Sequence, residues 1–184
     1  NLRPLSMFAE RVYRDDPCTC FLPQILDKNI YDAVDPKLAA KMHKAIAVLQ
    51  YKEEGQIIKR HPEFGLEKRN LLHHIDFERG VLEMDGREYK MLDMNFPTVD
   101  PADPLRLTDE EEELLHTLEL SFRHNARLHE HVRFLYSHGG MYKCYNSNLL
   151  YHGCIPMKKD GSFDTITIDG ISYGGKSLMD YFDR

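Results

Sequence analysis

Apolar residues at helical spacing predict two helices in the first third of the chain. The first spans about residues 4–15, and its apolar face comprises Leu5, Phe8, Ala9 and Val12. The second is predicted to begin at Asp35-Pro36, because aspartate is a favoured N-cap and proline suits the first helical position. Gly55 is expected to weaken this helix, which ends near residue 59. Its apolar positions are Leu38, Met42, Ala45, Ile46, Leu49, Ile57 and Ile58.

A third, longer helix is predicted after a proline-containing connector at residues 93–107. Thr108 is placed to cap it, and Glu111 completes a capping box. The acidic residues 109–113 then lie at the positive end of the helix dipole. After a bend near Asn125 the helix is expected to continue to about residue 137. The stripe expected to be buried comprises Leu114, Leu115, Leu118 and Phe122, followed by Leu128, Val132 and Leu135.

Two Asp-Gly dipeptides predict β-hairpins. Asp85-Gly86 and Asp169-Gly170 each separate two short apolar runs, a pattern typical of tight hairpin turns. The first belongs to a small meander predicted at about residues 75–91. The second belongs to a hairpin at about residues 163–173, after which a closing helix is predicted from residue 176.

The composition narrows the class of partner. The chain has 184 residues, of which 42% are hydrophobic and 29% charged, as in ordinary globular proteins. Its net charge of -6 and its lack of a basic stripe argue against nucleic acid as a partner. No apolar run approaches the roughly 20 residues that span a bilayer, so no membrane is expected. The cysteines are expected to be reduced thiols of a cytoplasmic protein: Cys18, Cys20, Cys144 and Cys154.

Both ends of the sequence suggest a longer parent chain. The first residue is Asn1 rather than methionine, and apolar residues follow at once. The last stretch, up to Arg184, has the pattern of a helix with no glycine or proline stop signal. We therefore expect an internal piece of a larger protein.

One segment carries candidate chemistry of its own. Residues 141–145 and 148–151 predict two strands around a turn, and the second runs into His152-Gly153. A histidine at a strand end is held by a rigid element, and a neutral imidazole is a common metal ligand. Gly153 would let the backbone approach a ligand or metal closely, and Pro156 would fix the exit of the loop. The alternative is a histidine that merely bonds a nearby carbonyl beside a glycine turn.

Several long strings resemble a known family. The segment Asn146-Ser-Asn-Leu-Leu-Tyr-His-Gly-Cys-Ile-Pro-Met157 is similar to the corresponding part of class III fructose-1,6-bisphosphatases. The same holds for Phe21-Leu-Pro-Gln-Ile-Leu-Asp-Lys, for the stretch from Asp35 to Ile46, for Glu54-Gly-Gln-Ile-Ile-Lys-Arg, for His131-Val-Arg-Phe-Leu and for Leu178-Met-Asp-Tyr-Phe-Asp-Arg. The resemblance covers essentially the whole chain.

The resemblance implies both an activity and a metal. The family belongs to the calcineurin-like metallophosphoesterases, so it implies hydrolysis of the sugar bisphosphate fructose 1,6-bisphosphate in gluconeogenesis, with manganese as the usual metal. In that superfamily a strand ending in His-Gly supplies one ligand of a two-metal site, and His152 matches this position. The superfamily's other signatures are missing, because the chain has no Gly-Asp, Asn-His or Gly-His dipeptide. His152 is thus the one metal ligand predicted, no catalytic residue is assigned, and the fragment alone is expected to be inactive.

The fold expected is an α+β fragment. A helix-rich insertion with small β-hairpins would be joined to part of the α/β sandwich of a calcineurin-like metallophosphoesterase. Residues 1–20 would end a preceding catalytic-domain element, and residues 21–137 would form the mainly helical insertion. Residues 138–184 would supply catalytic-domain strands, a hairpin and the start of a helix.

Other groups of histidine, cysteine and arginine residues are weaker candidates for a functional site. The histidines of the third helix, His124, His129 and His131, have offsets of five and two, so they do not share a face and predict a solvated surface. The four cysteines lack the spacing of a zinc knuckle or ribbon. Four arginines could meet sugar phosphate in the parent, although exposed arginines are common: Arg60, Arg69, Arg133 and Arg184. The alternative function is a regulatory or assembly module in which the helical region mediates self-association.

Overall fold

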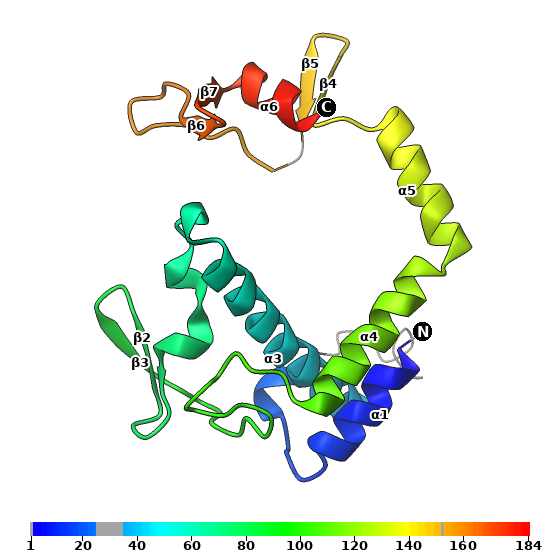
Figure 1. Ribbon diagram of the computed structural model, residues 1–184, viewed down its shortest axis with the longest axis vertical. Helices are drawn as coiled ribbons and strands as arrows, with labels where there is room; N and C mark the ends of the chain where they lie inside the picture. Colours follow the sequence, from blue (N-terminus) through cyan, green and yellow to red (C-terminus); the bar gives the residue numbers. More distant parts are fainter. Residues whose placement is uncertain (1, 25–34, 152) are drawn as a thin grey trace. The chain divides into compact units, whose positions relative to one another are not determined.

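The computed structural model describes residues 2–24, 35–151 and 153–184. The chain divides into two compact units, Asn1–Arg123 and His124–Arg184 (Figure 1). In the described ranges, no helix combines the length and the apolar character that a bilayer crossing requires. The expected α+β class is confirmed, since helices and small antiparallel sheets make up both units. The metallophosphoesterase sandwich stays a prediction, as do the three predicted domain boundaries.

Three helices build the core of the first unit: α1 (Arg3–Val12), α3 (Pro36–Arg60) and α4 (Asp109–Arg123). The apolar face predicted for α1 is confirmed, because Leu5, Phe8 and Ala9 are buried and Val12 packs partly buried against them. The core is completed from the other segments of the unit by Tyr13, Cys18, Ala40, Ala45, Leu49 and Leu114. Short 3-10 turns connect the longer elements: η1 (Thr19–Phe21), η2 (Pro62–Phe64), η3 (Glu67–Arg69) and η4 (Leu71–His74).

The helix starts follow the predicted capping chemistry. The Asp35 carboxylate accepts a hydrogen bond from the Lys37 N–H at 2.9 Å, and Pro36 occupies the first helical position of α3. At α4 the capping box is complete. The Thr108 N–H donates to Glu111 Oε2 at 2.8 Å, and the Glu111 N–H donates to Thr108 Oγ1 at 3.3 Å. The acidic residues 109–113 therefore begin a helix, as the sequence predicts.

The predicted meander is a three-stranded antiparallel sheet. Its strands β1 (Ile75–Asp76), β2 (Val81–Met84) and β3 (Arg87–Lys90) lie in that order. Asp85 and Gly86, between β2 and β3, both have positive φ, at 50° and 72°. This is the turn geometry that matches the twist of two-residue hairpins, and it explains why Asp-Gly is favoured there.

Two lysines of α3 are buried, which the sequence pattern did not predict. The Lys44 ammonium contacts Asp16 Oδ2 and Asp93 Oδ2, each at 2.6 Å. It also lies 5.6 Å from the centre of the Phe96 ring, within cation–π range. Two turns further along, the Lys52 ammonium donates to Glu111 Oε2 at 2.7 Å and to the Thr98 carbonyl at 2.6 Å. Both side chains are fully shielded from solvent.

The partners of Lys44 stabilise its charge. Burial acts to lower the pKa of Lys44, but the hydrogen bonds to Asp16 and Asp93 outweigh it and raise the pKa. Burial likewise acts to raise the pKa of Asp16, but Lys44 and the Cys18 N–H lower it. An aspartate whose pKa is lowered by folding stabilises the fold at pH values above its pKa in the unfolded chain, and this stabilisation is lost as the pH falls through its pKa in the folded chain. A lysine whose pKa is raised by folding stabilises the fold at pH values below its pKa in the unfolded chain, and this stabilisation is lost as the pH rises through its pKa in the folded chain. The contact is therefore fully stabilising across the neutral range.

Part of the predicted apolar stripe is solvent-exposed. On α3, Ile46 and Ile57 face solvent, whereas Ile58 is buried as predicted, and Val48, which was not predicted, is buried too. On α4, Leu114 is buried but Phe122 is exposed. The further stripe positions Val132 and Leu135 are also exposed. The predicted burial of Phe122, Val132 and Leu135 was therefore wrong, because helical spacing shows which positions share a face but not whether another segment covers that face.

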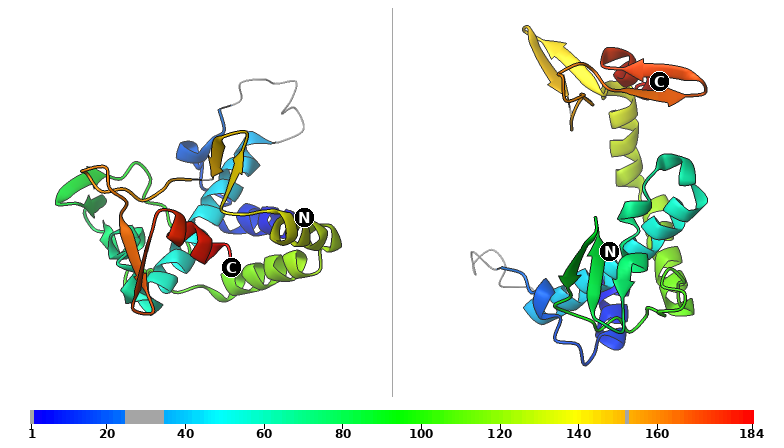
Figure 2. Two further views of the ribbon diagram at one scale, coloured as in Figure 1. Left: turned by 90° about the horizontal axis from the view of Figure 1, so that it is seen from above. Right: turned by 90° about the vertical axis from the view of Figure 1, so that its left-hand side faces the viewer.

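The second unit consists of two helices and two hairpins. Its helices are α5 (Ala126–His138) and α6 (Lys176–Phe182). Its strands pair as β4 (Tyr142–Tyr145) with β5 (Asn148–Tyr151), and as β6 (Thr165–Ile168) with β7 (Ile171–Gly174). Figure 2 shows each pair as a separate two-stranded ribbon. The predicted bend near Asn125 is confirmed as a helix break, since the Asn125 side chain accepts from the Leu128 N–H and caps α5.

Replacing Lys44 with methionine is expected to lower the free energy of unfolding by roughly 3–5 kcal/mol, because Asp16 and Asp93 would lose their buried cation. Lys59 is exposed on the same helix, so Lys59→Met is the matched control and should change stability by less than about 0.5 kcal/mol. Denaturant unfolding followed by helical circular dichroism measures both. Equal effects of the two substitutions would show that the buried contact is not stabilising.

Gly55 is expected to resist substitution although it lies within a helix. A Cβ at this position would collide with the buried Leu105 side chain and approach Asn70 Oδ1 to 2.8 Å. Gly55→Ala should therefore cost roughly 1–3 kcal/mol through overpacking, despite a helix-propensity gain of about 1 kcal/mol. The same substitution in a Leu105→Ala background should cost less, and a double-mutant cycle measures the coupling. A Gly55→Ala protein more stable than the wild type would refute the close contact.

Candidate functional site

The predicted metal ligand, His152, lies outside the described residues, so its role stays a prediction. The structure does describe the strand that leads to it and the glycine that follows. Gly153 has a φ of +85°, and no atom comes within 4 Å of the place where a Cβ would be. Glycine is therefore favoured here by the left-handed backbone rather than by crowding.

The β4–β5 hairpin determines where β5 ends. Asn146 and Ser147 form its turn, and both have positive φ, at 49° and 62°. This turn pairs Tyr145 with Asn148 and brings Tyr151, the last residue of β5, opposite Tyr142. The register of β5, up to Tyr151, is thus set by a two-residue turn at the other end of the hairpin.

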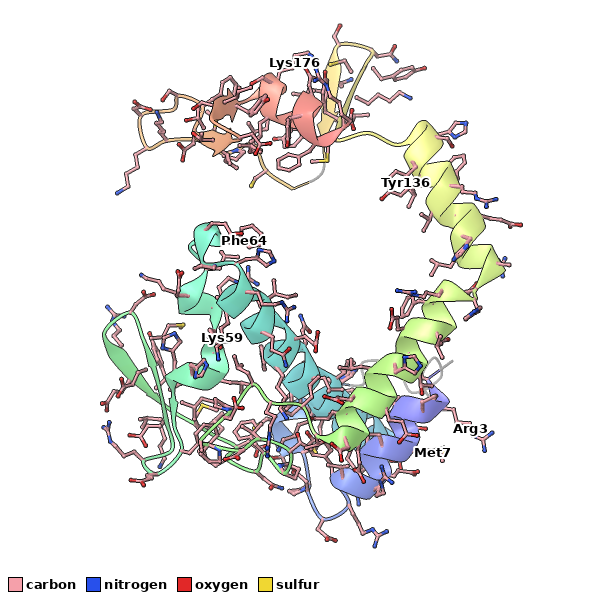
Figure 3. The ribbon with its side chains drawn as sticks, in the orientation of Figure 1. Arg3, Met7, Lys59, Phe64, Tyr136 and Lys176 are labelled. Atoms are coloured by element: carbon pink, nitrogen blue, oxygen red, sulfur yellow. The ribbon has the colours of Figure 1, made fainter. Side chains whose placement is uncertain are left out.

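Tyr142, the first residue of β4, pairs with the last residue of β5 and is anchored to α6 by a polar cluster. The Tyr142 hydroxyl donates to Asp180 Oδ1 at 2.9 Å, and Lys176 forms an ion pair with Asp180 Oδ2. The Lys176 ammonium also lies 5.4 Å from the centre of the Tyr142 ring; Figure 3 marks Lys176 on α6. The hydrogen bonds from Lys176 and Tyr142 hold the pKa of Asp180 below its usual value, so this carboxylate remains ionised at neutral pH.

A second anchor lies at Asp183, the residue directly after the end of α6. The Met141 N–H donates to Asp183 Oδ1 at 2.7 Å, and a Cβ on Gly140 would lie 3.3 Å from Asp183 Oδ2. An open cavity of about 520 Å³ adjoins this contact and the end of β5. Its lining includes His138, Lys143, Tyr151 and Asp183. The described residues of this lining include a cation, a carboxylate and aromatic rings, but no cluster of metal-binding groups.

The other candidate metal groups are not brought together. Within residues 2–24, 35–151 and 153–184, no group of three or more His, Cys, Asp or Glu side chains is arranged to hold a metal ion. His129 and His131 are exposed on α5, in agreement with a solvated surface. Arg69 is paired with Glu54 at 2.8 Å, so it is engaged within the first unit.

The cysteines differ in their surroundings rather than forming a site. Cys18 is buried, whereas Cys20, Cys144 and Cys154 are exposed, and all four are free thiols. Burial, together with the nearby Asp16 carboxylate, raises the pKa of the Cys18 thiol to about 11. A thiolate is the form that binds zinc, so Cys18 is a poor ligand.

A two-ion manganese site therefore does not fit the described residues. One imidazole cannot hold two divalent ions, and the side chains around the end of β5 supply no further ligand set. Any such centre needs ligands from outside the residues that the structure describes.

Sequence reasoning missed the polar groups that position these elements. Lys176 and Asp180 are four residues apart on α6, a spacing that predicts a helical ion pair. Lys44 and Lys52 fall on the same helical face as Ala45 and Leu49, and this periodicity was the available signal that they are buried.

Comparison with known proteins shows the family. Residues 1–184 match the family described as Firmicute fructose-1,6-bisphosphatase. The chain is 51% identical to a protein of Clostridium novyi (strain NT) called fructose-1,6-bisphosphatase class 3, over 183 residues that are 100% of this chain and 27% of that protein. It is 52% identical to the class 3 protein of Clostridium tetani and 50% identical to that of Bacteroides thetaiotaomicron, covering 28% of each. No solved structure matches.

The chain therefore belongs to the fructose-1,6-bisphosphatase family of class 3. It spans little more than a quarter of the length of the curated relatives that it matches.

Thiol labelling should separate Cys18 from the other cysteines. In the native chain at mildly alkaline pH, a small thiol reagent is expected to modify Cys20, Cys144 and Cys154 rapidly. Cys18 should react at least about 100-fold more slowly, because burial and its raised pKa suppress the thiolate. Peptide mass spectrometry measures each site, and unfolding the chain in urea should remove the difference. Fast native labelling of Cys18 would contradict its burial.

Proposed function

We propose that this chain is part of an enzyme that hydrolyses fructose 1,6-bisphosphate to fructose 6-phosphate and phosphate. The supporting observation is identity of about half of all residues with class 3 fructose-1,6-bisphosphatases over the full chain. Such an enzyme serves gluconeogenesis in the cytoplasm. Because the chain corresponds to about 28% of those relatives, the proposal concerns the longer protein.

We propose His152 as one ligand of the metal centre of that longer protein, with manganese as the metal. The support is its position directly after β5, whose end is fixed by the hairpin turn and whose partner strand is tied to α6. Such ions, when bound, supply Lewis-acid stabilisation of phosphoryl oxygens and an activated water. In this proposal the chain supplies one imidazole, and the remaining ligands come from elsewhere in the longer polypeptide.

The test is phosphate release from fructose 1,6-bisphosphate with manganese present. We expect the longer protein to be active and the 184-residue chain to be silent. His152→Ala should lower the activity of the longer protein by more than about 100-fold, since even loss of an outer-shell partner typically costs 10–100-fold. Bound manganese, measured by elemental analysis, should fall in parallel.

A matched histidine substitution controls for nonspecific damage. His43 is exposed on α3, and His43→Ala should leave both activity and metal content unchanged. A fully active His152→Ala protein would mean that His152 is only a strand-end histidine. Phosphatase activity in the isolated 184-residue chain would show that this segment carries its own catalytic centre.

A further inference from the structure

Exposed apolar side chains are distributed unevenly between the two units. Residues 124–184 are one third of the chain, yet about half of the large apolar side chains that are exposed among the described residues lie there. In the described part of this unit, the buried hydrophobic side chains are Leu178 and Met179. Two isolated two-stranded hairpins are at best marginally stable in water. This unit therefore does not enclose a core of its own.

Helix α5 is apolar on more than one side. None of its 13 residues is buried. Phe134, Leu135 and Tyr136 follow one another and are 62%, 63% and 89% exposed; Figure 3 marks Tyr136 on this helix. Successive residues of an α-helix are about 100° apart, so these three side chains cover more than half of its circumference. A helix whose apolar surface covers more than half of its circumference at one level is typical of one with neighbours on more than one side.

Strand β5 is apolar on both faces. Leu149, Leu150 and Tyr151 are consecutive and exposed, and successive strand residues point to opposite faces. A continuous apolar run is typical of a strand covered on both faces. In the described residues β5 pairs with β4 alone, so the backbone groups along its second edge are open to another strand.

The exposure of apolar side chains on more than one side of α5 and β5 argues against a second copy of this chain as the partner that covers them. A twofold dimer brings one surface patch against the same patch of its partner, and so covers one face. Enclosing both α5 and β5 on opposite sides requires several elements. The relatives have them, because this chain spans only 27–28% of their length.

We propose that residues 124–184 belong to a hydrophobic core that is completed by the polypeptide of the longer protein outside residues 1–184. In that core α5 is enclosed on several sides and a further strand pairs with the free edge of β5. Residues 1–123, by contrast, fold around their own core of α1, α3 and α4. The inference shares with the proposed function only the longer chain, and it does not depend on the activity.

Hydrogen exchange with mass spectrometry tests this directly. In the 184-residue chain, amides of α5 and β5 should exchange fast while those of α3 are protected. In the longer protein, the amides of α5 and β5 should slow by at least about 100-fold, with those of α3 changed much less. Slow exchange of α5 and β5 already in the 184-residue chain would overturn the proposal. So would fast exchange of these segments in the longer protein.

A matched pair of substitutions gives an independent readout. Tyr136 and Leu92 are both 89% exposed, one in each unit. Tyr136→Asp should lower the thermal midpoint or the soluble yield of the longer protein clearly, because it places a charge in the completed core. Leu92→Asp should change neither, since single exposed apolar residues are ordinary. If Tyr136→Asp instead dissociates a dimer, seen by light scattering, and leaves the midpoint unchanged, the occupant is a second copy and the proposal fails. None of these readouts measures phosphatase activity, so the proposed function can fail separately.

Discussion

The structure of residues 1–123 depends on the placement of two ammonium groups inside it. Lys44 and Lys52 lie on one side of α3, and a buried cation without anionic partners is strongly unfavourable. Their partners come from three different places: the turn after α1, the connector before α4 and the first turn of α4 itself. Two of these segments, the turn after α1 and the connector before α4, have no helix or regular strand at the residues that contact the lysines. The lysines therefore help to hold these irregular segments against α3.

Local rules of the sequence predicted most of the secondary structure. The capping box of Thr108 and Glu111, the cap at Asp35 and the two Asp-Gly turns all depend on residues within four positions of one another. Burial was predicted less well, because it depends on neighbours distant in the sequence. A lysine within an apolar stripe is usually expected to reach solvent, so Lys44 and Lys52 were not recognised. Phe122 and Leu135 continue an apolar pattern for which the described residues provide no partner.

Of the candidate site, the sequence predicted the strand β5 but not the side chains that would complete a metal centre. The hairpin register brings Tyr151 to the end of β5, Gly153 has a positive φ, and the family comparison agrees with the resemblance of the same segment. The remaining ligands could not be predicted, since a two-metal centre gathers side chains from several segments and this chain covers about 28% of its relatives. The polar cluster of Tyr142, Lys176 and Asp180 joins residues up to 38 positions apart, beyond the reach of spacing rules.

Glu111 has a consequence for the order of folding. Its Oε2 atom accepts hydrogen bonds from both the Thr108 N–H and the Lys52 ammonium, so the same carboxylate caps the start of α4 and neutralises the charge of Lys52 on α3. The lysine and the glutamate are 59 residues apart, and Lys44 and Asp93 are 49 apart. Chain loops of this length must close before these contacts can form. The entropy cost of closing them slows folding relative to a bundle of helices that contact their neighbours in the sequence. During synthesis, α3 emerges from the ribosome long before Glu111, and until then Lys52 must stay hydrated. The first unit can therefore reach its final packing only after the start of α4 has been translated.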